Sequence, residues 1–218
     1  KAYLADYPYT PYVDEVYTMQ GILLTEQKQY KPAVQTMAKV DVKQLSRKMI
    51  PLYNFHMGYA YFQLGEESKA LTYLQRLKKK DNPYALQATY YVGCCYYNQR
   101  EYGKALVEFL TLEQNGGYQQ IAPYYIVQIY YAQGAYDKVL ERAEVLLADY
   151  PENEYNDELH RIAGEIYYRD SVYEKAVSHL KDYHQLRVEK KQEVLRNDLH
   201  LLGISNYRIQ QYADAVTY

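Results

Sequence analysis

The chain lacks tryptophan and is poor in phenylalanine and cysteine, with three and two residues of these types among 218. None of its apolar runs approaches the roughly 18 to 20 residues that a membrane-spanning helix requires. The two cysteines, Cys94 and Cys95, are adjacent, and neighbouring side chains on a helix point about 100° apart, so we expect no disulfide between them. We expect Cys95 to be a small core residue and Cys94 to be half-exposed. The two cysteines therefore do not indicate whether the protein resides in an oxidising or a reducing compartment.

An excess of charge of one sign is also missing, because 25 Lys and Arg residues face 27 Asp and Glu residues, for a net charge of −2. This balance argues against a nucleic-acid groove, which needs a basic face, although it leaves a local basic patch open. With 48% hydrophobic residues, the composition is that of a folded chain. The N-terminus shows no charged-then-apolar signal pattern.

Tyrosine is abundant, at 31 residues, and is therefore the main aromatic packing residue. A phenol ring can pack against a neighbouring helix while its hydroxyl reaches water or a carbonyl group at the edge. This property suits a thin solenoid, in which few positions lie far from solvent.

One spacing recurs along the chain: a small first residue, an aromatic residue at +3, another at +9, and a small or β-branched residue at +12. The clearest copies are Gly93, Tyr96, Tyr102, Ala105 and Gly164, Tyr167, Tyr173, Ala176. Weaker copies begin at Gly21, Gly58, Val127 and Gly203. Successive first positions lie 37, 35, 34, 37 and 39 residues apart, the range of a helix-turn-helix repeat. The spacing predicts an all-α solenoid of antiparallel helix pairs.

A longer internal match fixes the register of the repeats. Residues 4–21 and 147–164 share nine of eighteen residues, and their offset of 143 spans four repeats. We predict one array over 1–218, with full repeats at 11–48, 49–83, 84–118, 119–153 and 154–189 and partial repeats at 1–10 and 190–218. Residues 1–6 should end a second helix, and the chain should be a piece of a longer array. The longest spacing predicts an extended loop or a lengthened first helix near 187–196.

Signals of catalysis are sparse. The five histidines form no His-x-x-x-His pair, no Cys-x-x-Cys motif accompanies them, and no phosphate-cradling glycine loop occurs. The Asp-Glu pairs at 14–15 and 157–158 recur with the repeat, so we interpret them as helix-start charges favoured by the helix dipole. We therefore predict a chain that is not an enzyme and has no cofactor or metal site.

The repeated cassette, with an apolar residue at +16, resembles the tetratricopeptide repeat over nearly the whole chain. The +16 residues are Met37, Leu74, Phe109, Ala143 and Leu180. The resemblance implies a right-handed superhelical solenoid in which each first helix lines a concave groove for a partner protein or peptide. The sequence departs from the pattern at Glu67, Val127 and Val139, which puts the geometry of the second and fourth repeats in doubt.

The groove implied by the resemblance can be assigned by residue. Position +3 should pack in the core (Tyr61, Tyr96, Tyr130 and Tyr167), and position +4 should turn about 100° toward the groove. A groove that is aromatic centrally and basic distally is predicted, although packing is an equally open interpretation of the same tyrosines. Its candidate residues are Phe55, Tyr59, Phe62, Tyr90, Tyr97, Tyr124, Tyr131, Arg161, Tyr168, Arg169, Tyr207 and Arg208, with His200 beside them.

The type of partner stays partly open. No asparagine follows the small first residue of any repeat, so the carboxylate clamp of chaperone-binding tetratricopeptide domains is not expected. Ala-Asp-Tyr-Pro, at 5–8 and 148–151, resembles bacterial cell-envelope tetratricopeptide proteins, which implies a periplasmic or outer-membrane-associated scaffold; a cytoplasmic location is the alternative. A glycan or cell-wall binder and a regulatory module of a larger signalling protein are the alternative functions. The oligomeric state is not predicted.

Overall fold

The structure is a computed structural model that describes residues 10–78 and 82–218. The chain divides into two compact units, residues 1–112 and 113–218. The second helix predicted to end within residues 1–6 lies outside the described residues. The described residues form α-helices and short 3-10 helices, with no strand among them. The prediction of an all-α chain is confirmed.

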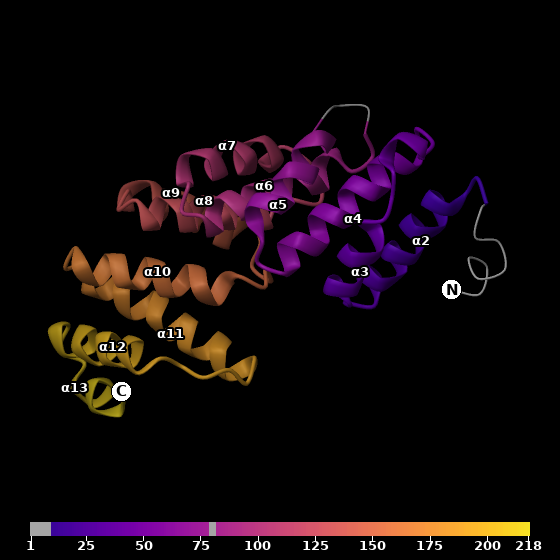
Figure 1. Ribbon diagram of the computed structural model, residues 1–218. Helices are drawn as coiled ribbons and strands as arrows, with labels where there is room; N and C mark the ends of the chain where they lie inside the picture. The colour runs from indigo at the N-terminus through magenta and orange to yellow at the C-terminus, as the bar shows by residue number, and fades with distance from the viewer. Residues whose placement is uncertain (1–9, 79–81) are drawn as a thin grey trace. The chain divides into compact units, whose positions relative to one another are not determined.

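The first unit contains successive antiparallel helix pairs, coloured indigo to magenta in Figure 1. The first helix of each pair carries the small first residue of the repeat, and the second helix carries positions +12 and +16. Two short 3-10 helices, Val42–Gln44 and Gln75–Leu77, follow the second helices. The α-helices are α2 (Val13–Glu26), α3 (Tyr30–Met37), α4 (Met49–Gln63), α5 (Glu67–Leu74), α6 (Ala85–Asn98) and α7 (Tyr102–Glu113), whose last residue begins the second unit.

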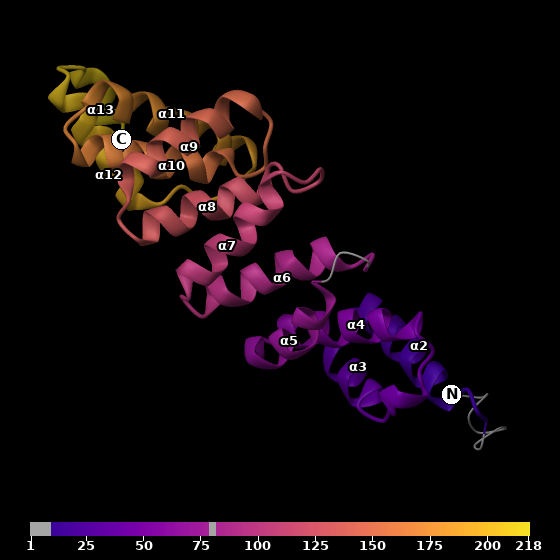
Figure 2. The ribbon, with the colours of Figure 1, turned by 90° about the horizontal axis from the view of Figure 1, so that it is seen from above.

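The second unit repeats the same pairing, coloured orange to yellow toward its C-terminal end in Figure 2. Its helices are α8 (Ile121–Ala132), α9 (Tyr136–Asp149), α10 (Asn156–Arg169), α11 (Tyr173–Glu189), α12 (Arg196–Arg208) and α13 (Tyr212–Thr217). The long repeat spacing is accommodated by α11, a second helix of 17 residues, and by residues 190–195. Of the two predicted alternatives, the extended loop is found at residues 190–195 and the lengthened first helix is not, since the added turn belongs to the second helix.

Two positions after the last residue of every described first helix stands a residue in the left-handed conformation, at +7 of its repeat. The φ angles lie between 59° and 71° at Lys28, Gly65, Arg100, Gly134, Ser171 and Gln210. The amide of the following residue donates to the carbonyl five residues earlier, as Val172 does to Tyr167 at 2.8 Å. This hydrogen bond satisfies a carbonyl group at the helix end and turns the chain into the second helix.

The small first residue is required by close approach of the second helix. A Cβ atom added to Gly164 would lie 2.7 Å from Cγ of Leu180, and one added to Gly58 would lie 2.5 Å from Cγ of Leu74. Gly21 has the same relationship to Met37. The spacing of the cassette therefore reflects one packing contact, in which the side chain at +16 occupies the space that a Cβ atom on the first residue would fill.

The fourth repeat departs from the cassette in a compensated way. Val127 replaces the glycine and Ala143 replaces the large +16 side chain, and both are fully buried in one cluster with Val139. The larger first residue thus meets a smaller partner, which keeps the volume of the contact similar. The departures at Val127 and Val139 both enlarge a side chain, and the small Ala143 in the same cluster leaves room for them.

The prediction for the cysteines is half confirmed. Cys95 is fully buried among Ala88, Val92 and Leu74, as expected for a small core residue. Cys94 is also buried, with 3% of its surface exposed, so its predicted half-exposure is wrong. The residues Val92 to Cys95 are all buried because α6 has neighbouring elements on more than one of its faces. Burial raises the pKa of the Cys95 thiol to about 12.

Candidate functional site

The tyrosines at +3 lie nearer the edge of the helix layer than predicted. Tyr167 is buried, and Tyr61, Tyr96 and Tyr130 are half-buried and pack against the core clusters, so the predicted packing at +3 is confirmed although three of the four rings keep an exposed edge. In each of these four repeats a lysine at +11 covers the outer side of the ring, with its ammonium group over the ring face. The distances to the ring centroids are 4.8 to 5.3 Å for Lys69, Lys104, Lys138 and Lys175.

In the first unit, predicted groove residues of α4 gather around one tyrosine of α6. The ring of Tyr91 lies 5.1 Å from Tyr59, 5.2 Å from Phe62 and 6.2 Å from Phe55, measured between centroids. Tyr90 contacts the same ring at 5.1 Å. The structure thus brings four candidate residues together through Tyr91, which the sequence prediction did not include.

A second kind of ring contact links consecutive repeats. Phe55 stacks on Tyr84 with centroids 4.8 Å apart, and Tyr124 stacks on Tyr155 at 4.3 Å. In both pairs a ring at −3 of one repeat meets a tyrosine at −9 of the next. The recurrence of tyrosine at −9 was the sequence signal that could have found Tyr84 and Tyr155.

In the second unit, three candidate residues line a single hollow of about 250 Å³. Tyr131 comes from α8, and Tyr168 and Arg169 come from the end of α10. The other lining residues are Tyr136, Glu165, Ile166, Asn197 and Leu201. We call this hollow the tyrosine pocket.

Polar contacts fix two walls of the tyrosine pocket. Burial, together with a hydrogen bond between its hydroxyl and the Glu165 carboxylate, raises the pKa of Tyr131 to about 12. The guanidinium of Arg169 lies 3.7 Å from the centroid of the Tyr136 ring and forms an ion pair with Asp170 at 2.8 Å. Both charged groups of the pocket are therefore already engaged within the chain.

The distal arginines are paired in the same manner. Arg161 forms ion pairs with Glu158 at 2.7 Å and with Glu165 at 3.2 Å, and hydrogen bonding to Glu158 raises its pKa. Arg208 lies over the ring of Tyr173 at 6.0 Å. The basic end of the predicted groove thus consists of arginines that have partners in neighbouring turns or repeats.

The remaining candidates lie apart from the tyrosine pocket. Tyr97 is half-buried and contacts Tyr102 edge-on, with centroids 5.8 Å apart. Tyr207 is 61% exposed and contacts Tyr212 in the same way at 5.6 Å. Tyr207 and the exposed His200 border a separate hollow between α12 and α13.

Neither a metal-ligand cluster nor a membrane-spanning helix occurs among the described residues. Within residues 10–78 and 82–218, no three His, Cys, Asp or Glu side chains converge as they would around a metal ion. Over the same ranges, no helix combines the length and hydropathy needed to cross a bilayer.

Comparison with known proteins decides the fold family. Residues 54–81 match the model of the tetratricopeptide repeat family. The fold is that of the tetratricopeptide repeat proteins. A tetratricopeptide repeat protein from Parabacteroides merdae is similar over 99% of this chain and 80% of its own, with 18% identity and a TM-score of 0.64. None of the curated protein sequences gives a significant match.

Two further tetratricopeptide-like structures share the architecture. PilF of Pseudomonas aeruginosa is similar over 94% of this chain and 88% of its own, with 13% identity and a TM-score of 0.68. MamA of Desulfovibrio magneticus is similar over 77% of this chain and 90% of its own, with 18% identity and a TM-score of 0.62. At these identities the likeness concerns the fold of the tetratricopeptide chain.

Proposed function

We propose that this protein is a non-catalytic scaffold whose first helices bind an extended or helical segment of a partner protein. The observation that carries the proposal is the tyrosine pocket, which lies between the +4 tyrosines of consecutive repeats, Tyr131 and Tyr168. Its volume of about 250 Å³ equals that of about eight water molecules at ~30 Å³ each, enough for one large side chain.

The chemistry of the pocket favours an apolar side chain. Arg169 and Glu165 have partners within the chain, so a charged ligand would have to displace an existing contact. Ile166 and the tyrosine rings supply the apolar lining. Rigid rings give a large contact area at a low entropic cost, which suits recognition of a peptide segment.

The first unit supports the same proposal with a different surface. The rings of Phe55, Tyr59, Phe62 and Tyr91 are half-buried and in mutual contact, so each keeps part of its face available. A cluster of this kind is preorganised, because the rings hold one another in place before a partner arrives. We assign it to contact with the apolar side of the partner segment.

The cellular role is proposed from sequence resemblance. Ala-Asp-Tyr-Pro at 148–151 resembles cell-envelope tetratricopeptide proteins, and we infer that the scaffold acts in a periplasmic or outer-membrane-associated assembly. Fractionation of the native cell with an antibody to this chain tests the location. Recovery in the cytoplasmic fraction alone would contradict it.

Site-specific photocrosslinking tests the binding surface. Benzoylphenylalanine replaces Tyr131 in one sample and the adjacent Tyr130 in the other; both side chains are half-buried, but Tyr130 lies beneath Lys138. We expect a discrete protein adduct from position 131 and none from position 130. Equal adducts from both positions would reject the groove, and adducts with glycan alone would favour the cell-wall alternative.

A further inference from the structure

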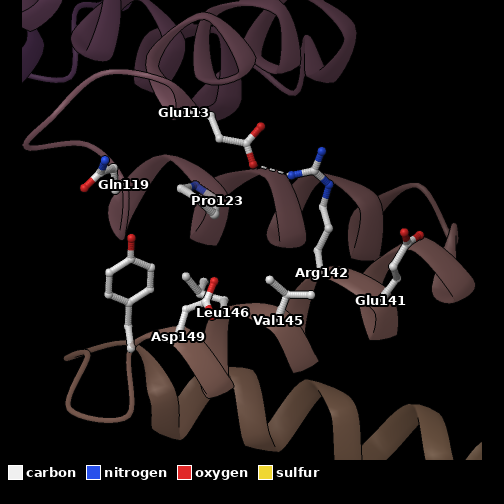
Figure 3. A pocket seen from close by; sticks show the side chains of 9 residues that line it. Glu113, Gln119, Pro123, Glu141, Arg142, Val145, Leu146 and Asp149 are labelled. Atoms are coloured by element: carbon white, nitrogen blue, oxygen red, sulfur yellow. Dashed lines mark hydrogen bonds and ion pairs between the residues drawn. The ribbon is translucent and has the colours of Figure 1, made fainter.

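A second hollow in the second unit lies apart from the tyrosine pocket and shares no residue with it. Its volume is about 340 Å³. Figure 3 shows its lining side chains, which come from the end of α7, the start of α8 and the outer turns of α9. They are Glu113, Gln119, Pro123, Glu141, Arg142, Val145, Leu146, Asp149 and Tyr150. We call this hollow the α9 hollow.

The walls of the α9 hollow are held by packing and hydrogen bonds. The Asn156 side-chain amide donates to the carbonyl oxygens of Tyr150 and Pro151, both at 2.9 Å, and so fixes the turn that carries the Tyr150 ring. Tyr150 packs against the core cluster that contains Leu146. The hollow is therefore formed without a ligand.

One end of the α9 hollow is closed by an ion pair. The guanidinium of Arg142 donates to the Glu113 carboxylate at 2.5 Å, and Figure 3 marks this contact. Glu113 stands 20 positions after the first residue of its repeat, and Arg142 stands 15 positions after that of the next. The pair therefore joins α9 to the first residue of the second unit and neutralises the only cation in the lining.

The remaining charges are carboxylates. Glu141 and Asp149 are exposed, and neither has an ion-pair partner among the residues that the structure describes. Val145 lies one helical turn from each of them and is 57% exposed. The α9 hollow thus offers an apolar floor between two uncompensated carboxylates, which repels phosphate groups and attracts a cation on an apolar stem.

Elsewhere in the second unit, one arginine already lies between an aromatic ring and a carboxylate. Arg169 lies on the Tyr136 ring and pairs with the carboxylate of Asp170. The α9 hollow supplies the same two groups, the Tyr150 ring and the Asp149 carboxylate, without an arginine between them. An aromatic face and a carboxylate together suit a planar guanidinium better than a compact ammonium group.

We propose that the α9 hollow is a docking site for an arginine side chain of a protein partner, with a neighbouring apolar side chain on Val145. The guanidinium forms an ion pair with Asp149 and lies against the Tyr150 ring, and the Glu141 carboxylate, two helical turns earlier on α9, adds a longer-range attraction. This contact is separate from the groove of the first helices and does not depend on it.

The acetylated and amidated tripeptide Leu-Arg-Leu is the probe, titrated into the 218-residue chain labelled with ¹⁵N. The same tripeptide with citrulline, which keeps the shape of arginine and lacks its charge, is the control. We expect the arginine peptide to shift the backbone amides of residues 141–150, and the citrulline peptide to bind at least about tenfold more weakly.

Matched variants separate the proposed contact from general charge attraction. Glu141→Gln with Asp149→Asn should weaken binding of the arginine peptide at least about tenfold, whereas Glu152→Gln, an exposed position outside the hollow, should leave it within about twofold. Unchanged thermal unfolding establishes that the variants are folded. Equal binding of the citrulline peptide, absence of shifts in 141–150, or equal loss with Glu152→Gln would overturn the proposal.

Discussion

Arg169 at +5 of the fifth repeat lies on the ring of Tyr136 at +9 of the fourth, 3.7 Å from its centroid. The same two positions meet again in Arg208 and Tyr173. Where Glu67 replaces the tyrosine at +9, Asn98 at +5 donates to its carboxylate at 3.3 Å. Position +5 of one repeat therefore contacts position +9 of the preceding repeat. The residue types at the two positions differ between repeats, but the same two positions meet each time.

Replacing Arg169 tests how much this contact stabilises the second unit. Because the Arg169 side chain is 49% exposed and solvent screens its charge, we expect Arg169→Gln to lower the free energy of unfolding only slightly. Urea denaturation of Arg169→Gln, of Tyr136→Leu and of the double variant measures the coupling between the two side chains. Simple additivity of the two single changes would show that the ring and the guanidinium do not interact.

The close contact at the first position gives a second prediction. Gly164→Val places a side chain against Leu180 and should destabilise the chain by about 1 to 3 kcal/mol. Leu180→Ala makes room for the new valine. The double variant then has the same pair of side chains as Val127 and Ala143 in the fourth repeat, so it should be more stable than the sum of the two single losses predicts. If the losses add, side-chain size is not exchanged across this contact.

The left-handed helix ends give a third prediction. Ser171 has a φ of 62°, which costs about 1 kcal/mol for a residue with a Cβ atom, so Ser171→Gly should raise the free energy of unfolding by up to that amount. Gly134→Ala should lower it for the same reason. Gly103→Ala is the control, because Gly103 lies within α7 without a positive φ and should gain about 0.5 to 1 kcal/mol from helix propensity.

A pair of histidines predicts a pH dependence. Nδ1 of His160 lies 3.0 Å from Nδ1 of His179 and 3.7 Å from Asp182, and His179 Nε2 lies 3.3 Å from Glu144. Burial and the neighbouring imidazole lower the pKa of His160 below its ordinary 6.5. The unfolded chain therefore binds the proton more readily, so stability should fall as the pH drops below about 6.5.

Urea titrations at pH 7.5 and pH 5.5 measure this dependence in the native chain and in His160→Asn. The variant should lose less stability than the native chain between the two pH values, because it no longer carries the group whose protonation opposes folding. An equal loss in both proteins would assign the pH dependence to other groups.

The sequence predicted the features that repeat and missed those that depend on contacts between particular side chains. The succession of antiparallel helix pairs follows from the cassette and was confirmed. The size exchange between Val127 and Ala143 needed the packed cluster, because each residue departs from the pattern for a reason that lies in the other.

The candidate site shows the same division. Tyr131, Tyr168 and Arg169 were named from their repeat positions, and the structure places all three around one pocket. Tyr91 was missed because its role depends on rings from α4, the first helix of the preceding repeat. The pairing of Arg161 with Glu158 and Glu165 was also missed, although the spacings of three and four residues on one helix were visible.

The most direct test of the scaffold is the affinity of the crosslinked partner for two matched double variants, measured by calorimetry. Tyr97→Ala with Tyr131→Ala removes two half-buried +4 rings, and Tyr96→Ala with Tyr130→Ala removes the half-buried +3 rings beside them. With helicity unchanged in both, we predict at least about a tenfold loss of affinity for the first and less than about a threefold loss for the second. An equal loss in both, or no loss in the first, would contradict binding in the groove.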